Sequence, residues 1–297
     1  MKRISALFLA AGLLLAAAEI HAHPGSGIVV DREGNVYFVD TGSGIWKIDR
    51  EGKLTKLSAP AYHWMAIDID KRLAGVTLPH YSRGGATVER DRNDPRVIVS
   101  SDFPIAVGPD GALYFPWFGA GDRLEIFRLT PSGTTTEFIS VPSGRDGKPL
   151  RWLNDLTAAE DGSIYYTENR AIGRISPNGD VSTVAANITL TGCDSVPEVG
   201  PELGPYFRGL DVDAQGNVYV AATGCRTVLK IAPDKKVSTV LRASAPWSPT
   251  AVAVTGTDCY VLEYYHTPGD NRREWLPRVR KVSGDGTVVT IASIDHR

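Results

Sequence analysis

The chain has 297 residues, of which 42% are hydrophobic and 22% are charged, and its formal net charge is -2. This composition supplies enough apolar side chains for a sizeable core and is unlike that of a disordered chain. Because the charge is nearly balanced, we expect neither nucleic acid nor an anionic membrane surface as the main partner.

The first 22 residues have the pattern of a signal peptide. Two basic residues precede the apolar run 4–18, which is short for a membrane span but suits the core of an export signal. Cleavage is expected after Ala18 or Ala22, and an uncleaved membrane anchor is the alternative. No other long apolar run appears, so residues 23–297 should form a periplasmic or secreted domain without membrane contact.

A 15-residue pattern recurs along this domain and predicts its architecture. Each copy combines a short apolar segment, a turn and an aromatic or β-branched segment, as two neighbouring strands require. The copies begin at Gly27, Ala66, Pro104, Asp155, Gly209 and Thr250. Successive copies therefore lie 39, 38, 51, 54 and 41 residues apart. A period near 40 with four short strands is typical of a β-propeller blade.

Six copies predict an all-β fold of six four-stranded blades around one channel, because only neighbouring blades can cover both faces of each sheet. The first unit reads GIVVDREGNVYFVD over residues 27–40, and the outer segments IWKID and LTKLS follow. The second unit is the weakest, since its turn KRLAG at residues 71–75 lacks the usual turn residues. A β-sandwich with a coincidental series of turns is the alternative.

Several copies also resemble known families. GIVVDREGNVYFVDT at residues 27–41 and GLDVDAQGNVYVAAT at 209–223 resemble NHL repeats. The latter copy and NDLTAAEDGSIYYTE at 154–168 also resemble the gluconolactonase/regucalcin superfamily and its lyase-like relatives. The resemblance covers nearly the whole mature chain and implies an NHL-type six-bladed propeller. It leaves hydrolase, lyase and pure binding functions open, because this architecture hosts all three.

The gluconolactonase-like resemblance implies a divalent ion, Ca²⁺ or Mg²⁺, held in the channel by carboxylate and amide oxygens. The family pattern has Glu before the first copy, Asn in an "ND" pair and Asp before a later "GL". Here these positions hold Ser26, Asn154 and Arg208. Asn154 is therefore the one remaining candidate metal ligand. Arg208 disfavours the site, because it places a permanent positive charge where the cation would lie.

The start of each innermost strand and the loop after its partner strand should open on one face, here called the top face. Groups able to transfer protons or stabilise charge are expected there, and the catalytic candidates are His63, Glu168, Arg208, Glu263 and His266. The candidate ligand-binding residues are Trp64, His80, Phe103, Trp117, Asn154 and Phe207. A three-histidine Zn²⁺ site, as in amidating lyases with this repeat, is less favoured.

These residues predict a small-molecule site for an anionic or carbonyl-bearing ligand, since an arginine among aromatic rings suits such groups. The expected activity is that of a lactonase-like hydrolase or a lyase. The competing interpretation is a non-catalytic propeller that binds a ligand or a protein partner. At the residue level, each histidine has a structural alternative, and Arg208 has an alternative ion pair with Asp102, Glu168 or Glu263.

Three cysteines are present, and an odd number in an exported protein predicts one disulfide and one free thiol. Cys225 follows the second strand of the fifth copy, and Cys193 lies in the spacer that leads into it. We therefore predict a Cys193–Cys225 disulfide. Cys259 falls inside the strand DCYVLEY and should be buried and free.

Overall fold

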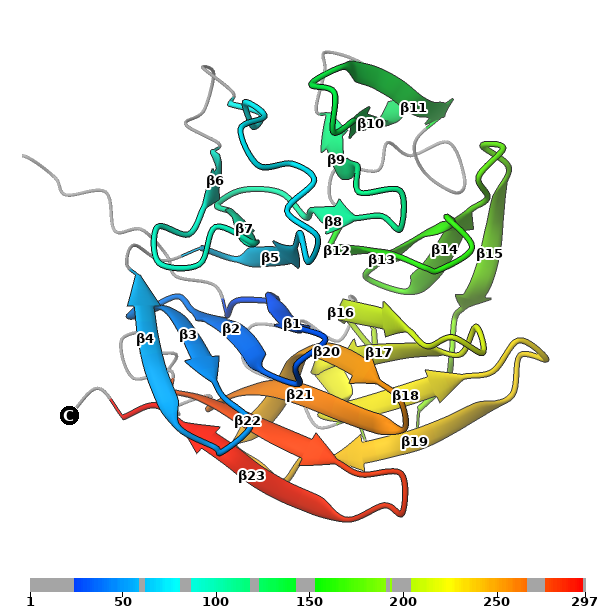
Figure 1. Ribbon diagram of the computed structural model, residues 1–297. Helices are drawn as coiled ribbons and strands as arrows, with labels where there is room; N and C mark the ends of the chain where they lie inside the picture. Colours follow the sequence, from blue (N-terminus) through cyan, green and yellow to red (C-terminus); the bar gives the residue numbers. More distant parts are fainter. Residues whose placement is uncertain are drawn as a thin grey trace, which may run out of the picture.

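The computed structural model is almost entirely β-structure. It describes residues 24–58, 62–80, 87–117, 123–142, 153–190, 193, 204–265 and 276–295. Within these residues the helical element is the short 3-10 turn η3 (Thr223–Cys225), and no helix is long and apolar enough to cross a membrane. The strands form six antiparallel sheets, arranged as blades around a common centre (Figure 1). The predicted six-bladed propeller is confirmed.

Five blades have four strands in chain order, with the first strand innermost. Blade 1 contains β1 (Ile28–Val30), β2 (Val36–Asp40), β3 (Gly44–Ile48) and β4 (Leu54–Ser58). Blade 3 contains β8 (Ala106–Val107), β9 (Leu113–Trp117), β10 (Arg123–Leu129) and β11 (Thr135–Pro142). Blade 4 contains β12 (Asp155–Ala158), β13 (Ile164–Glu168), β14 (Ala171–Ile175) and β15 (Val181–Ala186). Blade 5 contains β16 (Phe207–Val212), β17 (Val218–Ala222), β18 (Thr227–Ile231) and β19 (Val237–Arg242). Blade 6 contains β20 (Trp247–Thr255), β21 (Asp258–Tyr265), β22 (Pro277–Val282) and β23 (Val288–Ser293).

The repeated turn between the first two strands is held by an aspartate. In blade 1, the Asp31 carboxylate accepts a hydrogen bond from the Asn35 N–H at 2.8 Å, and Gly34 has a φ of 85°. In blade 5, the Asp213 carboxylate accepts from the Asn217 N–H, also at 2.8 Å. The recurrence of Asp, Gly and Asn therefore reflects one turn geometry, in which the left-handed position favours glycine.

The second blade departs from the predicted strand order. It contains β5 (Trp64–Ile67), β6 (Val88–Arg90) and β7 (Val97–Ser100), in the spatial order β5-β7-β6. An isolated bridge between His80 and Thr87 continues the sheet beyond β6. The chain thus runs from the innermost strand to the outer edge and then returns inward. We expected the segment after KRLAG to pair with the innermost strand, but β7 takes that place.

Burial explains this exchange of strands. The second strand of a blade is covered on both faces, and β7, with the sequence VIVS, is buried at every position. The KRLAG turn instead begins the crossing to the outer edge. There the Asp68 carboxylate accepts hydrogen bonds from the Arg72 N–H at 2.9 Å and the Leu73 N–H at 2.8 Å. Leu73 is fully buried and anchors the crossing in the core.

Blades 1 and 6 close the ring by packing. Each of these two sheets comes from its own contiguous segment, so the described strands of one blade are not shared with the other. Their facing side chains form one apolar cluster that includes Ile28, Phe38, Leu262 and Tyr264. The Tyr264 hydroxyl also donates to the Val39 carbonyl at 3.0 Å. Closure therefore depends on side chains from the first and last blades.

Residues 24–27, which we call the N-terminal strap, are buried where these blades meet. The Thr250 hydroxyl of blade 6 donates to the Gly25 carbonyl at 2.8 Å. The Ser26 N–H donates to the carbonyl of His63, next to blade 2, at 2.7 Å. The strap thus connects segments that are far apart in the sequence.

Candidate functional site at the channel mouth

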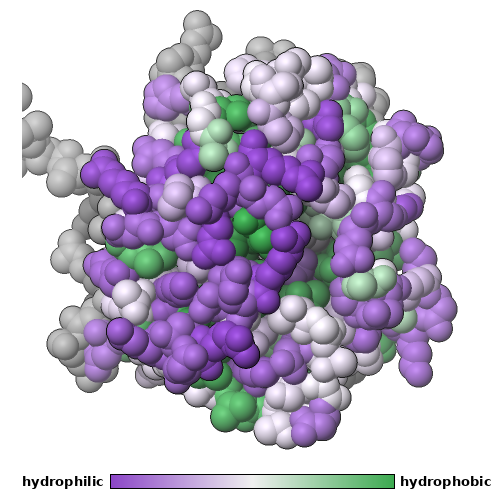
Figure 2. Space-filling model, in the orientation of Figure 1, coloured by the Kyte–Doolittle hydropathy of each residue, from purple (hydrophilic) through white to green (hydrophobic). Residues whose placement is uncertain are grey.

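The innermost strands β1, β5, β8, β12, β16 and β20 line a channel with a volume of about 150 Å³. Figure 2 shows a mainly hydrophilic face with apolar atoms visible at the centre of the ring. Most described lining residues are aliphatic, and the polar exceptions are Ser26, Asp155, Thr157 and Asp211. The polar groups of the channel therefore come from the N-terminal strap and from blades 4 and 5.

The two channel carboxylates bridge neighbouring blades. Asp155 of blade 4 accepts a hydrogen bond from the Leu210 N–H of blade 5 at 3.1 Å. Asp211 of blade 5 accepts from the Thr157 hydroxyl of blade 4 at 3.1 Å and from the Val254 N–H of blade 6 at 2.8 Å. Burial raises the pKa of Asp155 well above its ordinary value and that of Asp211 to about 6. Neither residue was predicted from the sequence, although a lone Asp in a short apolar strand is a usable signal.

His63 lies directly before β5 and is positioned as a base. Its Nδ1 is 2.7 Å from the Ser101 carbonyl oxygen. Because that oxygen only accepts, we assign the proton of the neutral ring to Nδ1 and leave Nε2 as an acceptor. Nε2 is buried without a hydrogen-bond partner among the described residues. Burial lowers the pKa of His63 below 6.5, and the charge of Arg208 acts in the same direction.

Arg208 projects from β16 and is 9% exposed. Its guanidinium donates a hydrogen bond to the carbonyl of Pro24 in the N-terminal strap. None of the ion pairs between described residues involves Arg208, so the pairs considered with Asp102, Glu168 or Glu263 are not found there. A buried cation held by a backbone carbonyl leaves positive charge available to a ligand.

Asn154 connects blades 2, 4 and 5. Its side-chain N–H groups donate to the Phe207 carbonyl at 2.6 Å and to Asn169 Oδ1 at 3.0 Å. The main-chain carbonyl of Asn154 accepts a hydrogen bond from the Trp64 indole N–H at 2.8 Å. The Trp64 and His63 rings lie 5.5 Å apart. Contacts and charge thus join His63, Trp64, Asn154, Arg208 and the main-chain carbonyl of Phe207. The predicted ligand-binding ring of Phe207 is instead fully buried in the apolar core between blades 4 and 5.

This group does not fit the divalent-metal site that the family resemblance implied. The Asn154 side chain uses its amide hydrogens on protein acceptors, while Ser26 and Arg208 supply no carboxylate. Within the described residues, no cluster of three or more His, Cys, Asp or Glu side chains is suited to hold a metal ion. We therefore derive no chemistry from a metal here.

Glu263 is enclosed within blade 6. Its carboxylate is fully buried, receives a hydrogen bond from Arg278 at 2.5 Å and lies 3.6 Å from Arg280. The Arg278 guanidinium also stacks over the Trp247 ring, 4.0 Å from its centroid. Glu263 is therefore a partner of these arginines, and its printed contacts do not connect it to Arg208.

The other aromatic candidates occupy different surroundings. Phe103 is 1% exposed and belongs to the apolar core between blades 2 and 3. Trp117 is 40% exposed and packs edge-on against Phe127. Trp117 and His80 line a separate apolar pocket of about 260 Å³. The structure therefore divides the predicted wall of the site between core, outer pocket and channel mouth.

The two remaining catalytic candidates are Glu168 and His266. Glu168 ends β13, is partly exposed and pairs in register with Ala171 across the tight turn to β14. His266 lies outside the described residues. The grouping at the channel mouth therefore rests on blades 2, 4 and 5.

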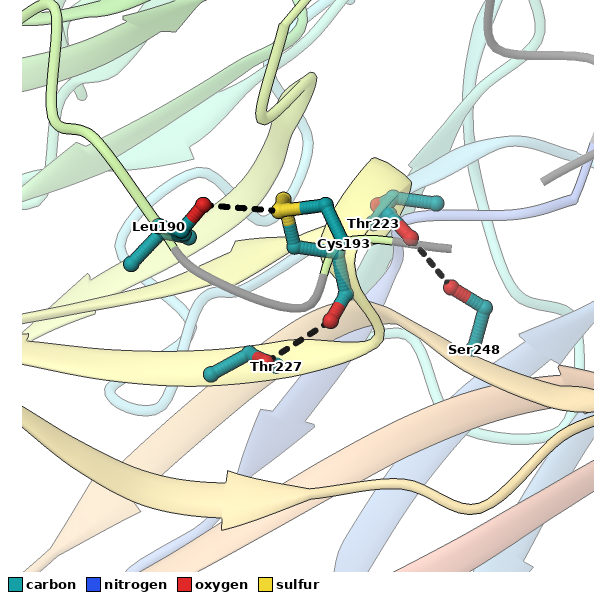
Figure 3. The surroundings of a disulfide bond; sticks show 6 residues. Leu190, Cys193, Thr223, Thr227 and Ser248 are labelled. Atoms are coloured by element: carbon teal, nitrogen blue, oxygen red, sulfur yellow. Dashed lines mark hydrogen bonds between the residues drawn. A yellow bond between two sulfur atoms is a disulfide. The ribbon is translucent and has the colours of Figure 1, made fainter. Parts of the chain in front are cut away.

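The predicted disulfide joins Cys193 to Cys225, whose Cα atoms lie 4.2 Å apart (Figure 3). Cys225 ends η3, and the Thr227 hydroxyl donates to its carbonyl at 2.8 Å. The Ser248 hydroxyl of blade 6 donates to the Thr223 carbonyl at 2.6 Å. The disulfide is therefore attached to a turn that is itself bonded to the next blade.

Cys259 is free and buried, as predicted. Burial raises the pKa of its thiol to about 12. Because the thiolate is the reactive form, Cys259 offers no nucleophile at neutral pH.

Comparison with known proteins supports the fold. No protein-family model and no curated protein matches the sequence. Regucalcin from Agrobacterium tumefaciens, described as a calcium-binding protein, superposes with a TM-score of 0.54 at 15% identity, over 84% of each chain. A streptogramin B lyase gives a TM-score of 0.50 at 16% identity, over 92% of this chain and 84% of the lyase. A Bacteroides thetaiotaomicron protein of unknown function gives 0.50 at 16% identity, over 81% and 67%.

Regucalcin and the lyase are six-bladed propellers, so the resemblance seen in the repeats is confirmed at the level of fold. At these identities the similarity carries no substrate or reaction to this chain.

Proposed function

We propose that the protein is an exported propeller enzyme that acts on a small anionic or carbonyl-bearing molecule at the channel mouth. Two observations carry this proposal. His63 Nε2 is a buried acceptor without a partner among the described residues, and the charge of the buried Arg208, which lies outside the described ion pairs, acts on the same histidine. Unsatisfied buried polar groups are rare in folded proteins, and a catalytic role is one explanation for such a group. We assign the activity to a lactonase-like hydrolase or a lyase.

His63 supplies the general base. Its lowered pKa keeps the imidazole neutral at neutral pH, and the Ser101 carbonyl fixes the tautomer that leaves Nε2 free to accept a proton. A base with these two properties needs no prior deprotonation. Arg208 supplies the complementary group, a guanidinium that stabilises negative charge developing on a carbonyl oxygen.

The same pair supports two related reactions. In lactone hydrolysis, Nε2 takes a proton from water as the water oxygen bonds to the carbonyl carbon. The ring C–O bond then breaks, and the leaving oxygen takes the proton back from the imidazolium. In a lyase reaction, Nε2 takes the proton from the carbon next to the carbonyl. The resulting carbanion expels a leaving group, which receives the proton. Arg208 stabilises the oxyanion in both cases.

Hydrolysis of δ-valerolactone and glucono-δ-lactone by the purified chain, followed with a pH indicator, tests the proposal. We expect His63→Gln to lower kcat/KM by about 100-fold or more and Arg208→Lys to lower it strongly, since Lys lacks the planar fork. His80→Gln is the matched control and should retain activity, because His80 lines a different pocket. Full activity in His63→Gln would exclude this mechanism.

The second candidate is a binding propeller without catalysis. The absent carboxylates at positions 26 and 208 favour it, because they remove the family-type metal site. It predicts saturable binding of the same lactones or of 5-hydroxyvalerate without turnover. Isothermal titration calorimetry on the chain, combined with the turnover assay, distinguishes the two candidates.

Export is part of the proposal and is supported by the N-terminal sequence pattern and by the disulfide, which forms in oxidising compartments. N-terminal sequencing of the protein recovered from the periplasm or medium should begin at residue 19 or 23. Recovery of the intact N-terminus in a membrane fraction would favour the uncleaved anchor.

A further inference from the structure

The N-terminal strap is fixed against several blades at the end of the channel. The Pro24 carbonyl accepts from Arg208 of blade 5, and the Gly25 carbonyl accepts from Thr250 of blade 6. The Ser26 N–H donates to the carbonyl that precedes blade 2. These four consecutive buried residues thus have partners in separate parts of the ring, and Ser26 among them lines the channel.

Close packing keeps the strap in place. A Cβ added at Gly25 would lie 2.5 Å from the Val39 side chain, and one at Gly27 would lie 2.8 Å from the Met65 Cβ. Atoms at such distances overlap, so both positions require glycine. The strap therefore presents its side chain at position 26 in a defined place.

Ser26 is the polar side chain of the strap, and its hydroxyl has no partner in the described part of the chain. The residue is 4% exposed, its Oγ makes no hydrogen bond to any described residue, and it lines the channel. A buried hydroxyl without a partner destabilises the folded protein, and alanine would fill the same space without that penalty. The backbone of the same residue bonds to His63, so this unsatisfied group is anchored next to the proposed base.

We infer that the N-terminal strap belongs to the ligand site, with Ser26 as a ligand-contacting residue. This inference rests on the proposed function. Ser26 Oγ would bond a ligand oxygen, on the same strap whose Pro24 carbonyl accepts a hydrogen bond from Arg208. The site thereby offers Ser26 and Arg208 as donors and His63 Nε2 as an acceptor. A matching ligand carries both a carbonyl or carboxylate oxygen and a hydroxyl group.

The test compares Ser26→Ala with Ser163→Ala. Ser163 is also buried and also lacks a side-chain partner among the described residues, but it lies in the turn between β12 and β13 and does not line the channel. Binding of 5-hydroxyvalerate and of valerate, which lacks the hydroxyl, is measured by calorimetry, and thermal unfolding is measured without ligand. We expect Ser26→Ala to unfold at the same or a higher temperature and to bind 5-hydroxyvalerate about five- to tenfold more weakly. Ser163→Ala should bind like the wild type.

Two results overturn the inference while leaving the proposed function standing. One is unchanged 5-hydroxyvalerate affinity and kcat/KM in Ser26→Ala, alongside losses in His63→Gln and Arg208→Lys. The other is a lower unfolding temperature in Ser26→Ala, which would show that the hydroxyl has a partner inside the protein. If the wild type binds neither probe and hydrolyses no lactone, the proposed function and the inference both fail.

Discussion

Burial shifts the pKa values of two titratable side chains near the channel in opposite directions, in each case so that the uncharged form is favoured over a wider pH range. Burial raises the pKa of the Asp211 carboxyl and lowers that of the His63 imidazole. In each case the charged form loses hydration that the protein only partly replaces. Each residue therefore gives a separate pH-dependent property.

Asp211 should make the protein less stable as the pH rises from about 4 to about 6. Its pKa is about 6 in the folded protein and 3.8 ordinarily, so the folded state binds this proton more tightly. The stabilisation is complete below the ordinary pKa and is lost as the pH passes the folded value. The shifted pKa of Asp211 contributes at most about 3 kcal/mol to the free energy of unfolding. Denaturant unfolding at several pH values should show a flatter profile in this window for Asp211→Asn, and equal slopes would contradict the assignment.

His63 should set the acid limb of the pH–activity profile. Protonation of Nε2 removes the base, so kcat/KM should fall as the pH drops through the pKa of His63, which lies below 6.5. Arg208→Gln removes a nearby positive charge, so the midpoint of the remaining activity should move to higher pH. An unchanged midpoint would show that another group controls this limb.

Individual residues of the site were partly predictable from the sequence. His63, Trp64, Asn154 and Arg208 were found because each stands at the start of an innermost strand. Glu263 was placed there too, but a partner strand brings Arg278 beside its carboxylate, and that pairing depends on register. The chemical type of Glu263 alone does not reveal which residue of a strand 15 positions later will pair with it.

The packing of neighbouring blades depends on glycine positions where no side chain fits. A Cβ on Gly209 would lie 2.5 Å from the Ala251 Cα, between β16 of blade 5 and β20 of blade 6. We expect Gly209→Ala to lower the free energy of unfolding by about 2–3 kcal/mol, because backbone atoms must move apart. Gly133→Ala is the control, since nothing lies within 4 Å and only its φ of 83° adds strain, worth about 1 kcal/mol. Chemical denaturation measures both, and equal losses would contradict this account.

The order of the strands within a blade was predictable only where the repeat was regular. The Asp–Gly–Asn turns identified blades 1 and 5, because one short turn places the next segment beside the innermost strand. Blade 2 has no such turn, and adjacency in the sequence then misled the prediction. The better guide is burial, since the apolar run VIVS at residues 97–100 suits the covered second position more than the segment that follows KRLAG.

At the scale of the whole molecule, the disulfide should stabilise the ring. Cys193 and Cys225 are separated by 32 residues, and closing a loop of this length is worth about 4 kcal/mol in the chain-entropy account. We expect Cys193→Ser/Cys225→Ser to lose this amount in denaturant unfolding. Cys259→Ser is the comparison, because it leaves the disulfide intact. A double variant as stable as the wild type would show that the link is dispensable.

The exchanged strand order of blade 2, β5-β7-β6, has a consequence for the sequence of folding events. In blade 1, Val30 and Val36 pair across a short turn, so the hairpin can form as soon as both have been synthesised. In blade 2, Ile67 pairs with Val97, and residues 68–96 must be complete first. Compared with the short turn of blade 1, the longer loop adds about 1.4 kcal/mol to the entropic free-energy cost of closing the hairpin. We therefore expect blade 2 to acquire hydrogen-exchange protection after its neighbours, which makes it the slow step in assembling a ring whose other blades form locally.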